Sequence, residues 1–93
     1  MAIDLKGIVK AIFPEVKVSD NFSKKEFVIT IDETTKYPQD IIIQAVNTSI
    51  EKLEGVKVGN KITCRCNLKG KMTKEGKYFN QITLWTLENK SEN

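Results

Sequence analysis

The feature that most constrains the fold is a strict alternation of apolar and polar side chains over residues 61–69. The apolar positions are Ile62, Cys64, Cys66 and Leu68. Because successive side chains of a β-strand point to opposite faces, this period predicts a strand with one buried face. A second alternating segment runs from residue 78 to 87, after a connection rich in Gly and Lys. Together the two segments predict a β-hairpin.

Three further strands are predicted upstream, over residues 3–13, 24–32 and 41–46. Gly7 lies inside the first of them and indicates a bend or bulge, as at the corner of a barrel. The third is almost continuously apolar, so we expect its outer face to be covered. Residues 47–55 are the only helical candidate: Thr48 and Glu51 have the spacing of a capping box, and Gly55 suits the left-handed residue that ends a helix.

The order of these elements is three strands, a short helix and two strands, which is the connectivity of the OB-fold. We therefore predict an all-β protein, a five-stranded OB-fold (Greek-key) barrel with one short helix between strands 3 and 4. An SH3-like barrel does not need a helix at this place, and a ferredoxin-like fold needs two longer helices. The length of 93 residues fits one domain over residues 1–88, followed by a polar, flexible end at 89–93.

The two cysteines, Cys64 and Cys66, stand two residues apart on one face of a strand, a spacing poorly suited to a disulfide between them. We expect reduced thiols inside the core. The chain has no histidine, so we expect neither a metal site nor a cofactor. No signal peptide is recognisable, and the longest apolar cluster, residues 41–43, is far too short to span a membrane. The expected location is the cytoplasm.

Positive charge is concentrated in the last third of the chain. The formal net charge of +3 divides into +1 for residues 1–31, −3 for residues 32–54, +6 for residues 55–87 and −1 for the remainder. Such an uneven distribution steers an anionic partner towards one side of the molecule. A basic hairpin face is also a common way to keep a small β domain soluble.

Aromatic residues occur on both faces of the last predicted strand. Tyr78 shares the parity of Ile82 and Leu84, which we expect to point inward, whereas Phe79, Trp85 and Leu87 have the opposite parity. A small barrel buries one face of each strand, so at least one large ring is expected outside. Such a ring either closes a barrel end, packs at a subunit interface or stacks on nucleic-acid bases.

The connections that flank the ligand-binding face of an OB-fold both contain basic and aromatic residues here. Lys24 and Lys25 follow Phe22 in the first connection, and the second supplies the lysines of the hairpin. The candidate phosphate contacts are Lys24, Lys25, Arg65, Lys69, Lys71, Lys74 and Lys77. The sequence contains no recognisable arrangement of nucleophile, base or paired acids, so we do not expect an enzyme.

The chain also resembles a family of short bacterial and phage OB-fold proteins, mostly of unknown function and related to single-stranded-DNA-binding proteins. The resemblance covers roughly residues 5–88 and is carried by the segments LKGIVKAIFP, KKEFVITI and YPQDIIIQAV and by the ending VGNKITCRCNLKGKMTKEGKYFNQITLWTLE. It implies an OB-fold that binds single-stranded DNA. By position it points to Lys24, Lys25, Lys69, Lys71, Tyr78, Phe79, Asn80 and Trp85. The chain lacks the acidic, hydrophobic tail tip of housekeeping single-strand binders, and ends in LENKSEN instead.

The function predicted from these observations is binding of single-stranded DNA with little sequence preference, during replication, recombination or repair. One domain of this size covers few nucleotides, so we expect a homodimer or homotetramer. The alternatives are a protein-interaction OB module, acting through Phe79, Trp85 and the apolar third strand, and a protein that binds RNA.

Overall fold

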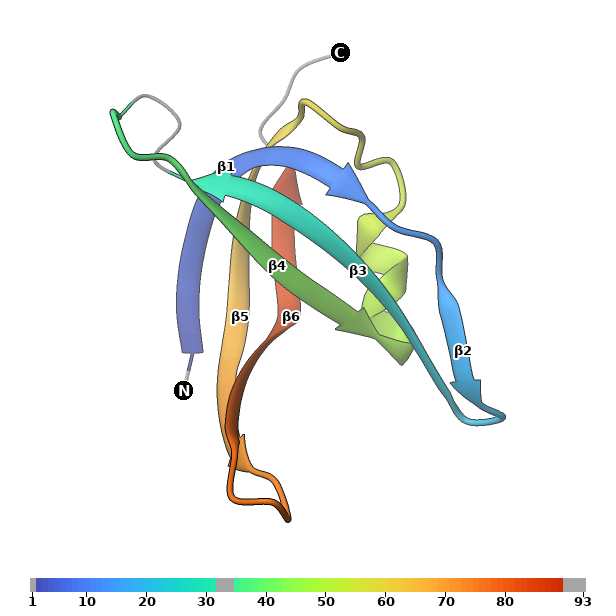
Figure 1. The fold of residues 1–93 in the computed structure, drawn as a ribbon. Coiled ribbons are helices and arrows are strands. Elements are labelled where there is room, and N and C mark those ends of the chain that lie inside the picture. The colour runs from blue at the N-terminus through green and yellow to red at the C-terminus, as the bar shows by residue number, and fades with distance from the viewer. Residues whose placement is uncertain (1, 32–34, 90–93) are drawn as a thin grey trace.

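The structure is a computed structural model of the 93-residue chain, and it describes residues 2–31 and 35–89. Its elements are the strands β1 (Ala2–Ile12), β2 (Val16–Ser19), β3 (Phe22–Ile31) and β4 (Gln39–Val46), the 3₁₀ helix η1 (Asn47–Leu53), and the strands β5 (Lys61–Met72) and β6 (Tyr78–Asn89) (Figure 1). Among these residues, no helix has the length and apolar character needed to cross a membrane.

The strands close into a barrel through long-range pairing. β1 is antiparallel to β5 over residues 2–8 and to β3 over residues 8–12, so it bridges both halves of the sheet. β3 pairs with β4 and β5 pairs with β6, both antiparallel, and one parallel pair, Gln44 with Thr83, joins β4 to β6. The five predicted strands correspond to β1, β3, β4, β5 and β6, with η1 between the third and fourth of them. The predicted OB-fold is thereby confirmed.

Strand β2 is not among the predicted strands, because it lies between the first two of them, 3–13 and 24–32. At the edge of the sheet, it pairs with β3 and with no other described strand, and all four of its residues are exposed. A four-residue segment with two valines gives too short an alternation to stand out from a loop. Together β2 and the start of β3 form a hairpin that projects from the barrel (Figure 1).

The helix is present, but the predicted capping box is wrong. η1 begins at Asn47 with Val46 as its N-cap, and no side chain caps it, so Thr48 lies inside the helix. The Asn47 side chain instead accepts a hydrogen bond from the Ser23 N–H at 3.1 Å, which ties the start of η1 to β3. Gly55 has the expected left-handed conformation, with φ of 84°.

The corner of the barrel lies close to Gly7, although the bulge is three residues further on. The register of β1 against β3 shifts between Val9 and Ala11, which leaves Lys10 as the extra residue. Gly7 lies just before Ile8, where β1 passes from β5 to β3, and a Cβ there would overlap the carbonyl oxygen of Thr30. Glycine is thus required at this position by the close approach of two backbones.

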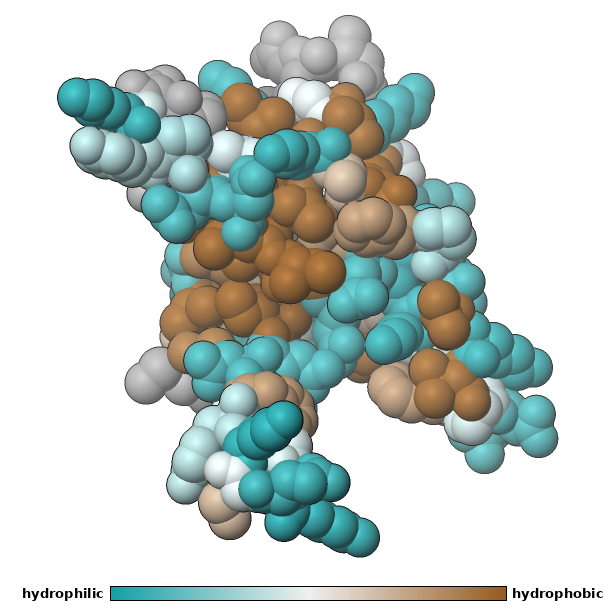
Figure 2. Space-filling view, in the orientation of Figure 1, coloured by the Kyte–Doolittle hydropathy of each residue, from teal (hydrophilic) through white to brown (hydrophobic). Residues whose placement is uncertain are grey.

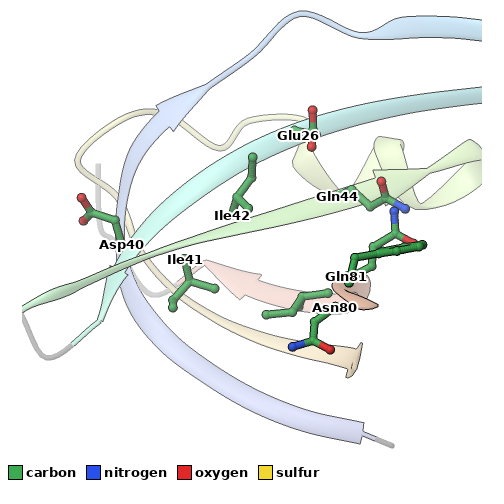
Figure 3. Close-up of a pocket in the computed structure, with 9 residues that line it drawn as sticks. Glu26, Asp40, Ile41, Ile42, Gln44, Asn80 and Gln81 are labelled. Atoms are coloured by element: carbon green, nitrogen blue, oxygen red, sulfur yellow. The ribbon is translucent and has the colours of Figure 1, made fainter. Parts of the chain in front are cut away.

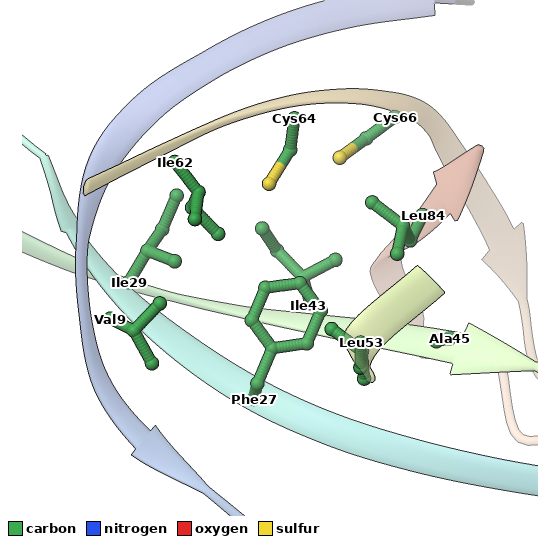
Figure 4. Close-up of a cluster of buried hydrophobic side chains, with 10 residues drawn as sticks. All are labelled: Val9, Phe27, Ile29, Ile43, Ala45, Leu53, Ile62, Cys64, Cys66 and Leu84. Carbon is green, nitrogen blue, oxygen red and sulfur yellow. The ribbon is translucent and has the colours of Figure 1, made fainter. Parts of the chain in front are cut away.

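The core is formed by inward-facing residues of the five barrel strands and by Leu53 of η1 (Figure 4). The face predicted for residues 62–68 is confirmed, because Ile62, Cys64 and Cys66 are 0% exposed and Leu68 is half-buried. Both cysteines are free thiols, as expected. Two effects raise the pKa of the Cys64 thiol above its ordinary value: the hydrogen bond with Cys66, which is the larger, and burial.

Strand β6 contains a bulge that changes one predicted face. Arg65 pairs with Thr86 and Cys66 pairs with Leu84, so Trp85 is the extra residue. Beyond the bulge the parity inverts, and Leu87 pairs with Cys64 and packs against the core. The prediction that Leu87 points outward with Phe79 and Trp85 is therefore wrong for Leu87. β6 itself continues to Asn89, and the remainder of the predicted flexible end, residues 90–93, lies outside the described residues.

Candidate nucleic-acid interface

The β5–β6 hairpin continues beyond the barrel as a projecting arm, residues 69–81 (Figure 1). Its antiparallel pairing extends to the pair Met72–Tyr78. The turn is closed by Thr73, whose N–H donates to the Lys77 carbonyl at 2.6 Å and whose Oγ1 accepts from the Lys77 N–H at 3.1 Å. Gly76 provides the left-handed residue, with φ of 83°. The arm thus has a defined twist and fixed faces.

One face of the arm combines two lysines with an aromatic ring. Lys71 pairs directly with Phe79, and Lys69 pairs with Gln81 two positions along the same face. These four residues and Gly70 line a hollow of about 200 Å³. The Phe79 side chain is 46% exposed, so one of its surfaces is free. An exposed ring beside two lysine side chains is suited to stack on a base while the neighbouring phosphates are neutralised.

The opposite face and the tip of the arm hold other predicted residues. Asn80 pairs with Gly70 and Tyr78 pairs with Met72, so both have the inward parity of the strand, yet both are exposed because the arm leaves the barrel there. Lys74 and Lys77 lie in the turn. Among the described residues, none forms a hydrogen bond or ion pair with the side-chain ammonium group of Lys69, Lys71, Lys74 or Lys77. Their charges remain available for an anion.

Arg65 and Trp85 form a separate cluster at the barrel end of the same hairpin. The Arg65 Nε and Nη2 atoms donate to the two carboxylate oxygens of Asp4 at 2.9 and 3.3 Å, and the guanidinium carbon lies 5.9 Å from the centre of the Trp85 ring. The hydrogen bond from Arg65 lowers the pKa of Asp4, and the same bond raises the pKa of Arg65. The charge of Arg65 is thus balanced, which leaves it a support for the Trp85 ring.

Lys24 and Lys25 lie on β3 beside its hairpin with β2, away from the β5–β6 arm (Figure 1). Lys24 pairs with Val46 on the outer face, whereas Lys25 pairs with the buried Ala45 and has the inward parity. The structure therefore directs these two lysines to opposite faces. Exposed apolar side chains lie on this hairpin and just before it: Phe13, Val16, Val18 and Phe22.

A cleft between β4 and β6 was not predicted. It encloses about 400 Å³ and includes Phe79 and Gln81 in its wall (Figure 3). Ile42 is 52% exposed there, so the expectation that the outer face of this strand is covered is wrong for the described residues. Figure 2 shows hydrophobic side chains gathered at the middle of this side of the molecule and mainly hydrophilic ones on the arm below. Gln81 could have been found from its shared parity with Phe79; the cleft depends on long-range pairing that no local pattern reveals.

Solved structures with the same fold confirm the architecture. The N-terminal domain of PriB from Thermoanaerobacter tencongensis, described as dimeric, aligns with a TM-score of 0.72 at 14% identity over 98% of this chain and 97% of its own. The mitochondrial single-stranded-DNA-binding protein Rim1 from S. cerevisiae aligns with a TM-score of 0.81 at 10% identity over 100% and 98%. The second single-stranded-DNA-binding protein of Mycobacterium smegmatis gives 0.70 at 4% identity over 96% and 87%.

At these identities the likeness establishes the fold alone. No curated protein sequence matches the chain. A family model does, over residues 4–88, which of the strands leaves out only the first two residues of β1 and the last residue of β6 and includes the whole of the basic arm. The chain therefore belongs to the DUF3127 family, a domain of unknown function.

Proposed function

We propose that this protein binds single-stranded DNA with little sequence preference, as a non-catalytic cytoplasmic protein of replication, recombination or repair. The observation that carries the proposal is the pairing of Phe79 with Lys71, with Lys69 beside them, on one exposed face of the arm. A single strand exposes both its phosphates and the flat faces of its bases, and this face offers a partner for each.

The weak sequence preference follows from the kind of contact. Ammonium groups bind phosphates of any nucleotide, and a phenyl ring stacks on any base. The fold places the arm at the connection that OB-folds use for oligonucleotides. The names of the similar structures, two of which are single-stranded-DNA-binding proteins, support the same proposal.

Residues on the arm and the adjoining barrel are assigned roles accordingly. Lys69, Lys71, Lys74 and Lys77 contact phosphates, Phe79 and Trp85 stack on bases, and Tyr78 and Asn80 contact the strand from the other face of the arm. Arg65 holds the Trp85 ring. Lys24, on the outer face of the β2–β3 hairpin, extends the path of a longer DNA strand, whereas Lys25 has the inward parity.

The test is a titration of a fluorescently labelled oligo-dT at two salt concentrations. We expect the double variant Lys69→Ala, Lys71→Ala to bind more weakly, with a salt slope reduced by about 0.7 for each lost phosphate contact. Lys36→Ala, Lys57→Ala is the matched control, because it removes the same charge from exposed lysines outside the arm. An equal loss in both variants would mean that only net charge matters and would contradict the assigned site.

Protein or RNA partners remain the alternatives. The exposed Phe79, Trp85 and Ile42 are the observation that favours a protein-interaction surface. Binding through such a surface depends little on salt, whereas several phosphate contacts make binding fall steeply with salt. Titration with oligo-U of the same length distinguishes RNA, because a stacking platform accepts either sugar.

A further inference from the structure

The barrel is open along one seam. β4 and β6 are joined by the single parallel pair Gln44–Thr83. On the N-terminal side of that pair, the described part of the chain pairs residues 39–43 with β3 alone and residues 78–82 with β5 alone, so the two strands diverge. The divergence produces the cleft of about 400 Å³, a size within the range of small-ligand sites.

The lining of the cleft suits a flat, uncharged group with a hydrogen-bonding edge. Three isoleucines and Phe79 provide apolar surface, three amide side chains provide donors and acceptors, and two carboxylates complete the wall. Within residues 2–31 and 35–89, no lysine or arginine lines it. The residues are Glu26, Asp40, Ile41, Ile42, Gln44, Phe79, Asn80, Gln81 and Ile82. A phosphate would be repelled by the carboxylates, whereas a nucleic-acid base has the required shape and polar edge.

The cleft adjoins the lysine-bearing hollow on the arm. Phe79 and Gln81 line both, so the two spaces share a wall. A strand whose phosphates lie on Lys69 and Lys71 can therefore direct a base into the cleft, beside the Phe79 ring.

The two carboxylates differ in their availability. Asp40 accepts hydrogen bonds from the Lys10 ammonium at 2.6 Å and from the Thr30 hydroxyl at 2.8 Å, and the first of these is the larger cause of its lowered pKa. Glu26 is half-buried, and its carboxylate has no partner among the residues that the structure describes. It is thus the free acceptor at this wall.

We infer that the cleft binds one base of the strand and favours cytosine, whose exocyclic amino group donates to Glu26, over uracil or thymine, which present a carbonyl oxygen at that position. The inference rests on the proposed function. It adds a preference for cytosine at one of the nucleotides that each domain binds. The remaining contacts, to phosphates and ring faces, stay independent of sequence.

The test compares short oligodeoxycytidine and oligodeoxyuridine, which have the same ring size and no methyl group. At equal length and salt, we expect the protein to bind the cytosine strand about fivefold or more tightly. Glu26→Gln should bring the two affinities close together, because an amide both donates and accepts. The control Glu51→Gln removes the same charge from an exposed position on η1 and should keep the preference. Melting curves verify that each variant is folded.

Nuclear magnetic resonance gives a second, independent readout. The side-chain amide of Gln44 lines the cleft but not the lysine-bearing hollow, so its signal should shift when oligodeoxycytidine is added. Equal affinities for the two strands, or a shift of the Gln81 amide without one of Gln44, would overturn the inference and leave the proposed function standing. Failure to bind either strand would overturn both.

Discussion

At the scale of single residues, Trp85 shows how one extra residue determines what faces solvent. Alternation from Phe79 places both Trp85 and Leu87 outside, but the bulge at Trp85 returns Leu87 to the core and leaves Trp85 54% exposed. The sequence has no pattern that predicts the bulge, because the bulge arises from how β6 pairs with Arg65 and Cys66 of β5. The Trp85 ring is held by Arg65, which Asp4 in turn fixes from β1.

We predict that Trp85→Ala makes the free energy of binding to oligo-dT less favourable by about 1–3 kcal/mol, the usual contribution of one stacked base. The melting temperature should change little, because the ring is largely exposed. In the native protein, the fluorescence of this single tryptophan should be quenched on adding oligonucleotide. Trp85→Phe is the matched control, since it keeps a ring for stacking. Unchanged fluorescence together with a smaller assembly in Trp85→Ala would instead identify a subunit contact.

At the scale of elements, the accuracy of the sequence prediction follows the length of each pattern. The alternation over residues 61–69 predicted the inward face of β5 correctly. A shift of this strand by one residue would turn all of its inward apolar side chains towards solvent, so the pattern allows a single register. The short β2, the uncapped η1 and the bulges at Lys10 and Trp85 depend on pairing between distant strands, which leaves no local signal. For the same reason the arm was predicted from its charge, whereas the open seam between β4 and β6 was not.

Gly7 allows a prediction about barrel closure. Gly7→Ala should lower the free energy of unfolding by about 1–3 kcal/mol, because the added methyl group would overlap the Thr30 carbonyl oxygen and lie 3.0 Å from the carbonyl carbon, and backbone atoms cannot easily move away. Gly70→Ala is the control: its new methyl group would lie 3.4 Å from the Asn80 side-chain oxygen, an ordinary contact with a movable group. Urea denaturation of both variants measures the difference. Equal stability of the two would contradict the assigned crossing of β1 and β3.

At the scale of the whole molecule, charge is separated from the barrel. Half of the +6 of residues 55–87 lies on the arm, where four lysines face one glutamate, whereas residues 32–54 carry −3. An approaching polyanion is therefore drawn to the arm before it touches the barrel, which raises the association rate at low salt. Composition alone, with its net charge of +3, gives no sign of this; dividing the charge along the chain does.

The size of the domain leads to the last prediction. The molecule measures 43 × 33 × 21 Å, and a single OB domain covers only about 4–16 nucleotides. Useful affinity for long DNA strands then requires several linked sites, which a homodimer or homotetramer provides through a high effective concentration.

Light scattering should give a mass of two or four times 10.6 kDa. Affinity should rise by about 10²-fold or more once an oligo-dT is long enough to reach a second subunit. A monomer mass, with affinity that increases only gradually with oligonucleotide length, would contradict this assembly and leave the arm as a single, weak site.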